Sequence, residues 1–75
     1  MMPDKEMQKA FGKLLKLRRN AMNMTQDDVA ELTGIDRSSY AHYEAGNRDI
    51  PFTNIYKLEE VLRFKISDFY KSTKL

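Results

Sequence analysis

The chain has 75 residues and a net charge of only +2, so we expect a single domain (residues 1–75) whose overall charge is a weak sign of nucleic-acid binding. It has no cysteine and one histidine, which leaves no disulfide and no thiolate or histidine cluster, and we expect no cofactor and no metal. Its apolar runs are two or three residues long and its first residues, MMPDKEMQK, lack the apolar core of a signal peptide, which predicts a cytoplasmic protein without a membrane span.

The first predicted helix covers residues 4–20. Apolar side chains recur along it and just beyond it at helical spacing: Met7, Phe11, Leu14, Leu15 and Met22. Positively charged side chains lie around the rest of the helix: Lys5, Lys9, Lys13, Lys16, Arg18 and Arg19. We interpret most of them as a solvated face, and non-specific nucleic-acid binding is the alternative.

A second helix is predicted over residues 26–33, after a short connector. Thr25 can cap it, and Asp28 stands three residues later, as a capping box requires. Met24 and Val29 occupy the two ends of a hydrophobic staple across this cap. Together these residues predict a well-defined helix start.

A tight turn and a third helix, over residues 37–45, follow. Gly34 can adopt the left-handed conformation that ends a helix, and Asp36 can cap the next one. Tyr40 and Tyr43 are expected in the core with their phenol groups near the surface, whereas stacking on bases would suit single strands. The outer side of the helix is left available: Arg37, Ser38, Ser39, Ala41 and His42. This arrangement, a helix-turn-helix, lets a protein lay its second helix in the DNA major groove.

The remaining residues predict two more helices. Gly46 ends the third helix, Pro51 opens a fourth over residues 52–63, and Ser67 can cap a short fifth helix. The fourth helix turns four apolar residues inward: Ile55, Leu58, Val61 and Leu62. The core then spans about residues 5–70, and the tail at 71–75 is expected to fray. The predicted fold class is all-α, a compact five-helix bundle.

Four segments together resemble a known family. They are GKLLKLRRNAMNMTQ, VAELTGIDRSSY, HYEAGNRDIP and IYKLEEVLRFKISDF, and the resemblance spans Gly12 to Phe69. The family is the lambda-repressor-like helix-turn-helix domains of the Cro/CI, or XRE, group. The resemblance implies a sequence-specific transcriptional regulator of double-stranded DNA, and within that class a repressor that binds an inverted-repeat operator as a homodimer.

The chain departs from the usual family residues at three positions. Thr33 stands where an apolar residue is common, Glu59 where a small residue is common, and Arg63 where glycine usually follows the fourth helix. One residue more than the commonest family spacing separates Gly46 from Pro51. These departures concern helix packing and the path of the loop after the third helix.

Four residues of the third helix are expected to contact bases: Arg37, Ser38, Ser39 and His42. Arg37 can donate two hydrogen bonds to guanine O6 and N7, and a phosphate contact is its alternative. Ser38 and Ser39 can bond a base or a phosphate, and Ser39 can instead bond the Asp36 cap. The resemblance implies that His42 reaches a base, and an ordinary surface histidine is the alternative.

Phosphate contacts, which fix the protein on the duplex, are expected from a second set of residues: Thr25, Gln26, Asn47, Arg48 and Arg19. Gln26 can bring a helix N-terminus and an amide up to the backbone. The resemblance places Asn47 and Arg48 beside the DNA, where a plain polar turn is the alternative. It also implies that Arg19 pairs with Glu44 and so fixes the angle of the third helix.

A homodimer would present two reading helices about one DNA turn, roughly 34 Å, apart. The predicted dimer interface is an apolar segment near the C-terminus: Phe64, Ile66, Phe69 and Tyr70. The alternative is that the first three close the base of the core and leave Tyr70 and Leu75 for a partner.

Other functions fit parts of the sequence. An antitoxin-type or other protein-interaction module would bind DNA only secondarily. Three acidic residues lie on the second helix: Asp27, Asp28 and Glu31. Acid in a first helical turn offsets the helix dipole, which explains Asp27 and Asp28 structurally. Contact with RNA polymerase or another partner protein is the alternative. An enzyme is not expected, because the sequence has no nucleophile–base pair, metal cluster or phosphate-binding loop.

Overall fold

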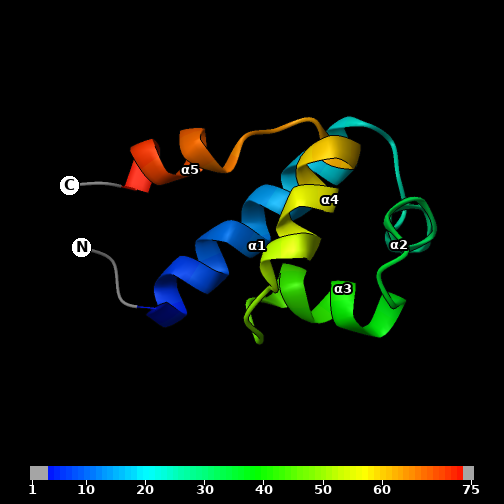
Figure 1. Cartoon of the computed structure of the whole chain (residues 1–75), viewed down its shortest axis with the longest axis horizontal. Coiled ribbons are helices and arrows are strands. Elements are labelled where there is room, and N and C mark those ends of the chain that lie inside the picture. Colours follow the sequence, from blue (N-terminus) through cyan, green and yellow to red (C-terminus); the bar gives the residue numbers. More distant parts are fainter. Residues whose placement is uncertain (1–3, 74–75) are drawn as a thin grey trace.

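The computed structural model describes residues 4–73, which form five α-helices and no strand (Figure 1). The helices are α1 (Asp4–Ala21), α2 (Gln26–Thr33), α3 (Arg37–Ala45), α4 (Phe52–Leu62) and α5 (Ile66–Thr73). The longest, α1, runs diagonally through the molecule and packs mainly against α3, while α2 and α5 lie at opposite ends (Figure 1). The predicted all-α class and the order of five helices are confirmed.

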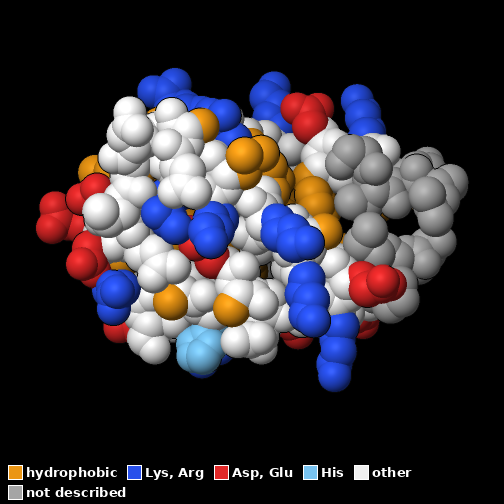
Figure 2. All heavy atoms as spheres, turned by 180° about the vertical axis from the view of Figure 1, so that it is seen from behind, with side chains coloured by type: hydrophobic (Ala, Val, Ile, Leu, Met, Phe, Trp, Pro, Cys, Tyr) orange, Lys and Arg blue, Asp and Glu red, His pale blue; other side chains and the backbone are white. Residues whose placement is uncertain are grey.

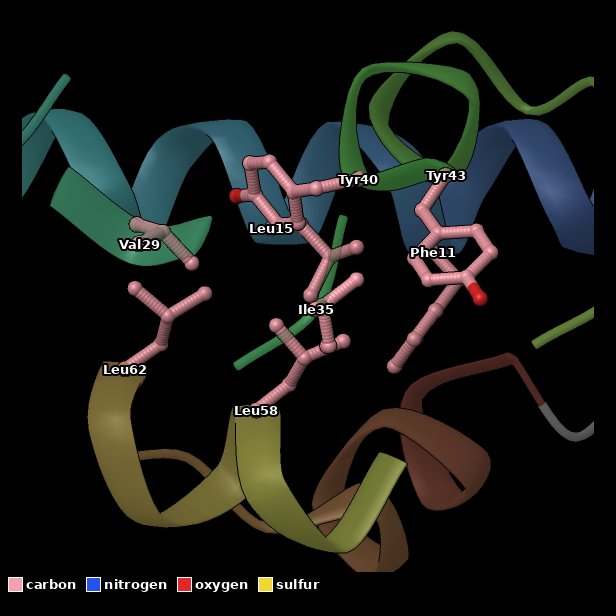
Figure 3. Close-up of a cluster of buried hydrophobic side chains, with 8 residues drawn as sticks. All are labelled: Phe11, Leu15, Val29, Ile35, Tyr40, Tyr43, Leu58 and Leu62. Carbon is pink, nitrogen blue, oxygen red and sulfur yellow. The ribbon is translucent and has the colours of Figure 1, made fainter. Parts of the chain in front are cut away.

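A single apolar core holds the helices together (Figure 3). Its buried members come from α1 to α4 and the turn between α2 and α3: Phe11, Leu15, Val29, Ile35, Tyr40, Tyr43, Leu58 and Leu62. Figure 3 shows the two leucines of α4 pointing toward Val29 and Ile35 of the helix-turn-helix. Burying each such side chain stabilises the fold by roughly 1.5–3 kcal/mol, so the core fixes the helix-turn-helix between α1 and α4.

The base of the core is closed by aromatic rings from the C-terminal segment. The Phe11 ring meets Phe64 and Phe69 edge to face, with ring centroids 5.7 and 5.1 Å apart. Ile66 is partly buried against the same cluster. Three of the four residues predicted as a dimer interface therefore pack at least partly inside their own chain, as the alternative supposed.

Local capping interactions hold the helix-turn-helix. Thr25 Oγ1 accepts a hydrogen bond from Asp28 N (3.0 Å) and Asp28 Oδ2 accepts one from Thr25 N (2.8 Å), which confirms the capping box. Gly34 ends α2 with φ +75°, and Asp36 Oδ2 accepts a hydrogen bond from Ser39 N (3.1 Å) at the start of α3. The turn thus forms largely from its own residues, as the sequence predicted.

Thr33, one of the departures from the family pattern, has a structural role in this turn. Its buried hydroxyl donates a hydrogen bond to Val29 O (2.7 Å) and accepts one from Ile35 N (3.1 Å). An apolar residue would leave the amide of Ile35 without this acceptor. The polar side chain therefore fits a buried position.

The helices α1 and α3 approach each other closely at Gly12. A Cβ atom built there would lie 2.7 Å from the carbonyl oxygen of Tyr43 and closer still to that of Glu44. Both oxygens belong to the backbone and cannot swing aside. Only glycine therefore allows the C-terminal turn of α3 to lie directly against α1.

Two helix boundaries near the C-terminus differ from the sequence prediction. The helix α4 ends at Leu62, because Arg63 adopts the left-handed conformation with φ +58°. The helix α5 begins at Ile66, and Glu59 Oε2 accepts a hydrogen bond from Ile66 N (2.6 Å). The prediction that Ser67 caps this helix is wrong, since the carboxylate of Glu59 reaches across from α4 to do so.

The ends of α1 and α5 also lie further along the chain than predicted. The first helix extends one residue beyond the expected limit, to Ala21. The last continues to Thr73, so residues 71–73 are helical where a frayed tail was expected. Residues 74 and 75, including the suggested partner contact Leu75, lie outside the described residues.

We expect the substitution Arg63→Gly to raise the free energy of unfolding by about 0.5–1 kcal/mol. Glycine adopts the left-handed conformation without steric strain, which outweighs its greater freedom in the unfolded chain. Thermal unfolding followed by circular dichroism would then show a Tm increase of roughly 2–8 °C. The control is Arg63→Ala, which keeps the strain; an equal gain in this variant would contradict the explanation.

Candidate nucleic-acid interface

The outward side of α3 carries the four residues predicted to contact bases. Arg37 and Ser38 are exposed in its first turn, and Ser39 and His42 are half-buried further along. The histidine lies at the lower edge of the face shown in Figure 2. The N-terminal end of α3, which is the end that enters the groove in this motif, is therefore accessible.

An ion pair to α2 holds Arg37. Its Nε lies 2.6 Å from Asp27 Oδ1, and the two side chains are 63% and 74% exposed. Pairs as exposed as this one contribute only about 0–1 kcal/mol, so a base or phosphate can readily replace Asp27. From the sequence, Asp27 is explained by the dipole of α2, with contact to another protein as the alternative. Its pairing with Arg37 is not predicted, because the two residues meet only when α2 and α3 fold together.

A second contact joins α3 to the loop that follows it. Arg48 Nη1 donates a hydrogen bond to Ser39 Oγ (3.1 Å), while the Asp36 cap is bonded to the Ser39 amide and not to its hydroxyl. The amide of Asn47 donates to His42 O (3.1 Å) at the end of the helix. Arg48, which is predicted to bind phosphate, and Ser39, which is predicted to contact bases, thus lie side by side.

Arg19, Gln26 and Glu44 form a polar cluster where α1, α2 and α3 meet. Arg19 Nε and Nη2 donate to the two carboxylate oxygens of Glu44 at 2.6 and 3.0 Å, and Gln26 Nε2 donates to Glu44 Oε1 at 3.1 Å. The Arg19 and Glu44 side chains are only 12% and 5% exposed. This cluster fixes the last turn of α3 relative to the start of α2.

The cluster shifts the ionisation of its members. Burial opposes the charged form of Glu44, but hydrogen bonds from Arg19 and Gln26 prevail and lower its pKa. The pKa of Arg19 is raised, chiefly by its hydrogen bond to Glu44. Both groups therefore stay charged across the neutral pH range.

The two core tyrosines differ from each other in their polar contacts. Tyr43 OH accepts a hydrogen bond from Asn54 Nδ2 (3.1 Å). The prediction that Tyr40 keeps its phenol group near the surface is wrong, since its side chain is fully buried beside Arg19 and Glu44. Its hydroxyl makes no hydrogen bond of normal geometry within the described residues, and burial raises its pKa.

The start of α2 retains hydrogen-bond donors for a ligand. The amide nitrogen of Gln26 uses one hydrogen on Glu44 and keeps a second, and the hydroxyl of Thr25 accepts from Asp28 and keeps its own hydrogen. Arg19, by contrast, also donates from Nη1 to Met24 O (2.9 Å), so each of its nitrogens already has a partner in the protein. Its geometry favours orientation of α3 over a phosphate contact.

The sequence analysis also missed an exposed aromatic pair on α4. Phe52 and Tyr56 lie one helical turn apart and are 82% and 58% exposed, and Tyr70 on α5 is 56% exposed. Aromatic residues at a spacing of four could have suggested this face. Between residues 4 and 73, no acidic or histidine side chains group to hold a metal ion, and no helix is long and apolar enough to cross a membrane.

A helix-turn-helix whose second helix is exposed at its N-terminal end defines a class of DNA-binding protein. The helix-turn-helix family HTH_3 matches residues 15–69, and the chain belongs to this family. The match starts three residues after the Gly12 limit of the resemblance and ends at the same Phe69.

Two similar proteins carry names that describe them as control or controller proteins. The chain is 31% identical over 61 residues to control protein C.MunI from Mycoplasma sp., an alignment that covers 80% of this chain and 82% of the relative. Its fold matches the crystal structure of the restriction-modification controller protein C.AhdI from Aeromonas hydrophila with a TM-score of 0.75 and 33% identity, over 80% of this chain and 91% of that one. The Cro/CI-like resemblance is thereby confirmed, and the chain is a DNA-binding regulator of transcription.

We expect stability to fall when the solution is acidified. Because the pKa of Glu44 is lowered in the fold from the usual 4.5, its charged form stabilises the protein above that pH, and this contribution is lost as the pH falls through the folded-state pKa. Tm measured from about pH 7 to about pH 3 should drop most in the acidic part of this range.

The variant Glu44→Gln separates this group from the other carboxylates. At neutral pH it should unfold more easily, by on the order of 3 kcal/mol, because Arg19 loses its charged partner. Its Tm should also vary less with pH than that of the parent chain. An unchanged pH dependence would show that Glu44 is not the group responsible.

Proposed function

We propose that this chain controls restriction-modification genes by binding an inverted-repeat operator as a homodimer, and that it represses by excluding RNA polymerase. Family membership and the two named regulators support the regulatory role. The observation that carries the proposal is the geometry of α3, which is exposed at its start and clamped near its end by Arg19, Gln26 and Glu44. Such a clamp orients the reading helix before DNA arrives, so that less ordering is needed on binding.

Base reading is assigned to the outward side of α3. Arg37 would leave Asp27 and donate two hydrogen bonds to guanine, which is worth about 1–3 kcal/mol of discrimination. Ser38, Ser39 and His42 would add contacts along the same groove. Breaking the ion pair of Arg37 with Asp27 costs little free energy, because both side chains are exposed to solvent.

Phosphate binding is assigned to both ends of the helix-turn-helix. Gln26 and Thr25 would meet one stretch of backbone at the N-terminus of α2, where the helix dipole favours an anion. Asn47 and Arg48, which lie in the loop after α3, would meet another. These contacts set the register of the protein on the duplex and carry no sequence information directly.

We infer a homodimer because one reading helix buries only a small area on DNA, and a single module of this kind seldom binds DNA tightly enough alone. Of the predicted interface residues, Tyr70 has the most exposed side chain. We assign the two-fold contact to the segment from Phe64 to Tyr70, with Tyr70 at its centre.

The first test is selection of bound duplexes from a random-sequence DNA pool near physiological salt, followed by sequencing. An inverted repeat should be enriched.

With Arg37→Ala we expect specificity to relax at one position of each half-site, because a bidentate base contact is lost. With Arg48→Ala all duplexes should bind more weakly alike, and the slope of log K against log salt should fall by about one for each protomer bound. Absence of any enriched sequence with the unaltered chain would overturn the operator proposal.

The dimer contact is tested by sedimentation equilibrium without DNA and by DNA-binding stoichiometry. Tyr70→Ser should weaken self-association by at least about tenfold, as expected for loss of a central aromatic contact. The matched control is Phe52→Ser with Tyr56→Ser, which removes exposed rings from α4 and should leave the dimer intact. If the α4 variant loses self-association and Tyr70→Ser keeps it, the interface lies on α4 instead.

A further inference from the structure

Four lysines of α1 share one side of that helix. With about 100° of rotation per residue, Lys5, Lys9, Lys13 and Lys16 fall within an arc of roughly 80°. All four are exposed. We call this set the lysine ridge; at about 1.5 Å per residue it is roughly 16 Å long.

Close backbone contacts fix the direction in which the lysine ridge lies. Gly12, which borders the arc, faces the carbonyl oxygens of Tyr43 and Glu44 at the end of α3. A Cβ atom on Gly46 would lie 2.7 Å from the Cα of Lys9. The lysine ridge therefore flanks the C-terminal end of the reading helix and the start of the loop that carries Arg48.

The molecular surface agrees with this placement. Figure 2 shows Lys and Arg side chains running across the face that also exposes the histidine of α3. This face therefore carries both positive side chains and part of the outward side of α3. A duplex held against α3 would lie next to the lysine ridge.

The lysine ridge is not explained by the stability of the protein. Within residues 4–73, the ion pairs of the structure are Arg19 with Glu44 and Arg37 with Asp27, and none involves these lysines. Like charges four residues apart destabilise a helix by roughly 0.2–0.5 kcal/mol per pair. A row of unpaired like charges beside a reading helix fits a polyanion.

We propose that the lysine ridge binds the DNA phosphate backbone bordering the groove occupied by α3, so that the contact area extends beyond the helix-turn-helix. The N-terminal end of α3 points to the bases, and its C-terminal end, where the ridge lies, points toward the backbone. The contacts are independent of sequence and add affinity and salt dependence only. This inference rests on the proposed DNA-binding function.

The test is the salt dependence of binding to the selected duplex. Each phosphate contact contributes about 0.9 to the slope of log K against log salt, so Lys9→Gln with Lys13→Gln should lower the slope by roughly 1–2 for each protomer, or about 2–4 for the proposed homodimer on its duplex. The matched control is Lys57→Gln with Lys71→Gln, which removes the same charge from exposed positions on α4 and α5, outside the segment assigned to the dimer contact. Its slope should change much less, and both variants should keep the base preference and the far-ultraviolet circular dichroism of the parent.

A second measurement uses duplexes with shortened flanks. Trimming the sequence outside the inverted repeat should weaken binding by the parent chain more than by the ridge variant, whose flank contacts are already reduced. Equal slopes in the ridge and control variants, or equal sensitivity to trimming in parent and ridge variant, would overturn the inference. If the unaltered chain shows no sequence preference at all, the proposed function itself is overturned.

Discussion

The position of α3 depends on the contact between α1 and the last turn of α3. Gly12 lets the two backbones meet, and the ion pair of Arg19 with Glu44 closes the same junction from the other end. The two contacts are complementary, because the first sets the distance between the helices and the second sets their angle. A reading helix anchored at its C-terminal end leaves its N-terminal turn open, which is the geometry that base recognition in a major groove needs.

Sequence reasoning succeeded where structure is local. The capping box of Thr25 and Asp28, the turn at Gly34 and the cap at Asp36 are each decided within a few residues, and all are present. Reasoning failed where a residue acts through a partner distant in sequence. The carboxylate of Glu59 caps α5 from another helix, and nothing in its immediate neighbours shows this.

The candidate site shows the same difference between features that the sequence predicts and contacts that only the folded chain brings together. Helical periodicity alone showed which side of α3 faces outward, and the family resemblance supplied the pairing of Arg19 with Glu44. Neither showed that Asp27 holds Arg37 or that Arg48 bonds Ser39, because such contacts depend on how α2 and the loop fold onto α3. The charge pattern of α1 was visible from the start, but its direction required the close approach at Gly12.

The cap that α4 provides for α5 also links the two helices dynamically. A cap formed within the connecting loop would let α5 fray and re-form alone, without disturbing its neighbour. Because Glu59 Oε2 accepts the hydrogen bond from Ile66 N, the start of α5 depends on a side chain that α4 holds in place. Unfolding of the end of α4 would therefore also remove the cap at the start of α5. A C-terminal helix of only eight residues thereby acquires some of the persistence of the helix before it.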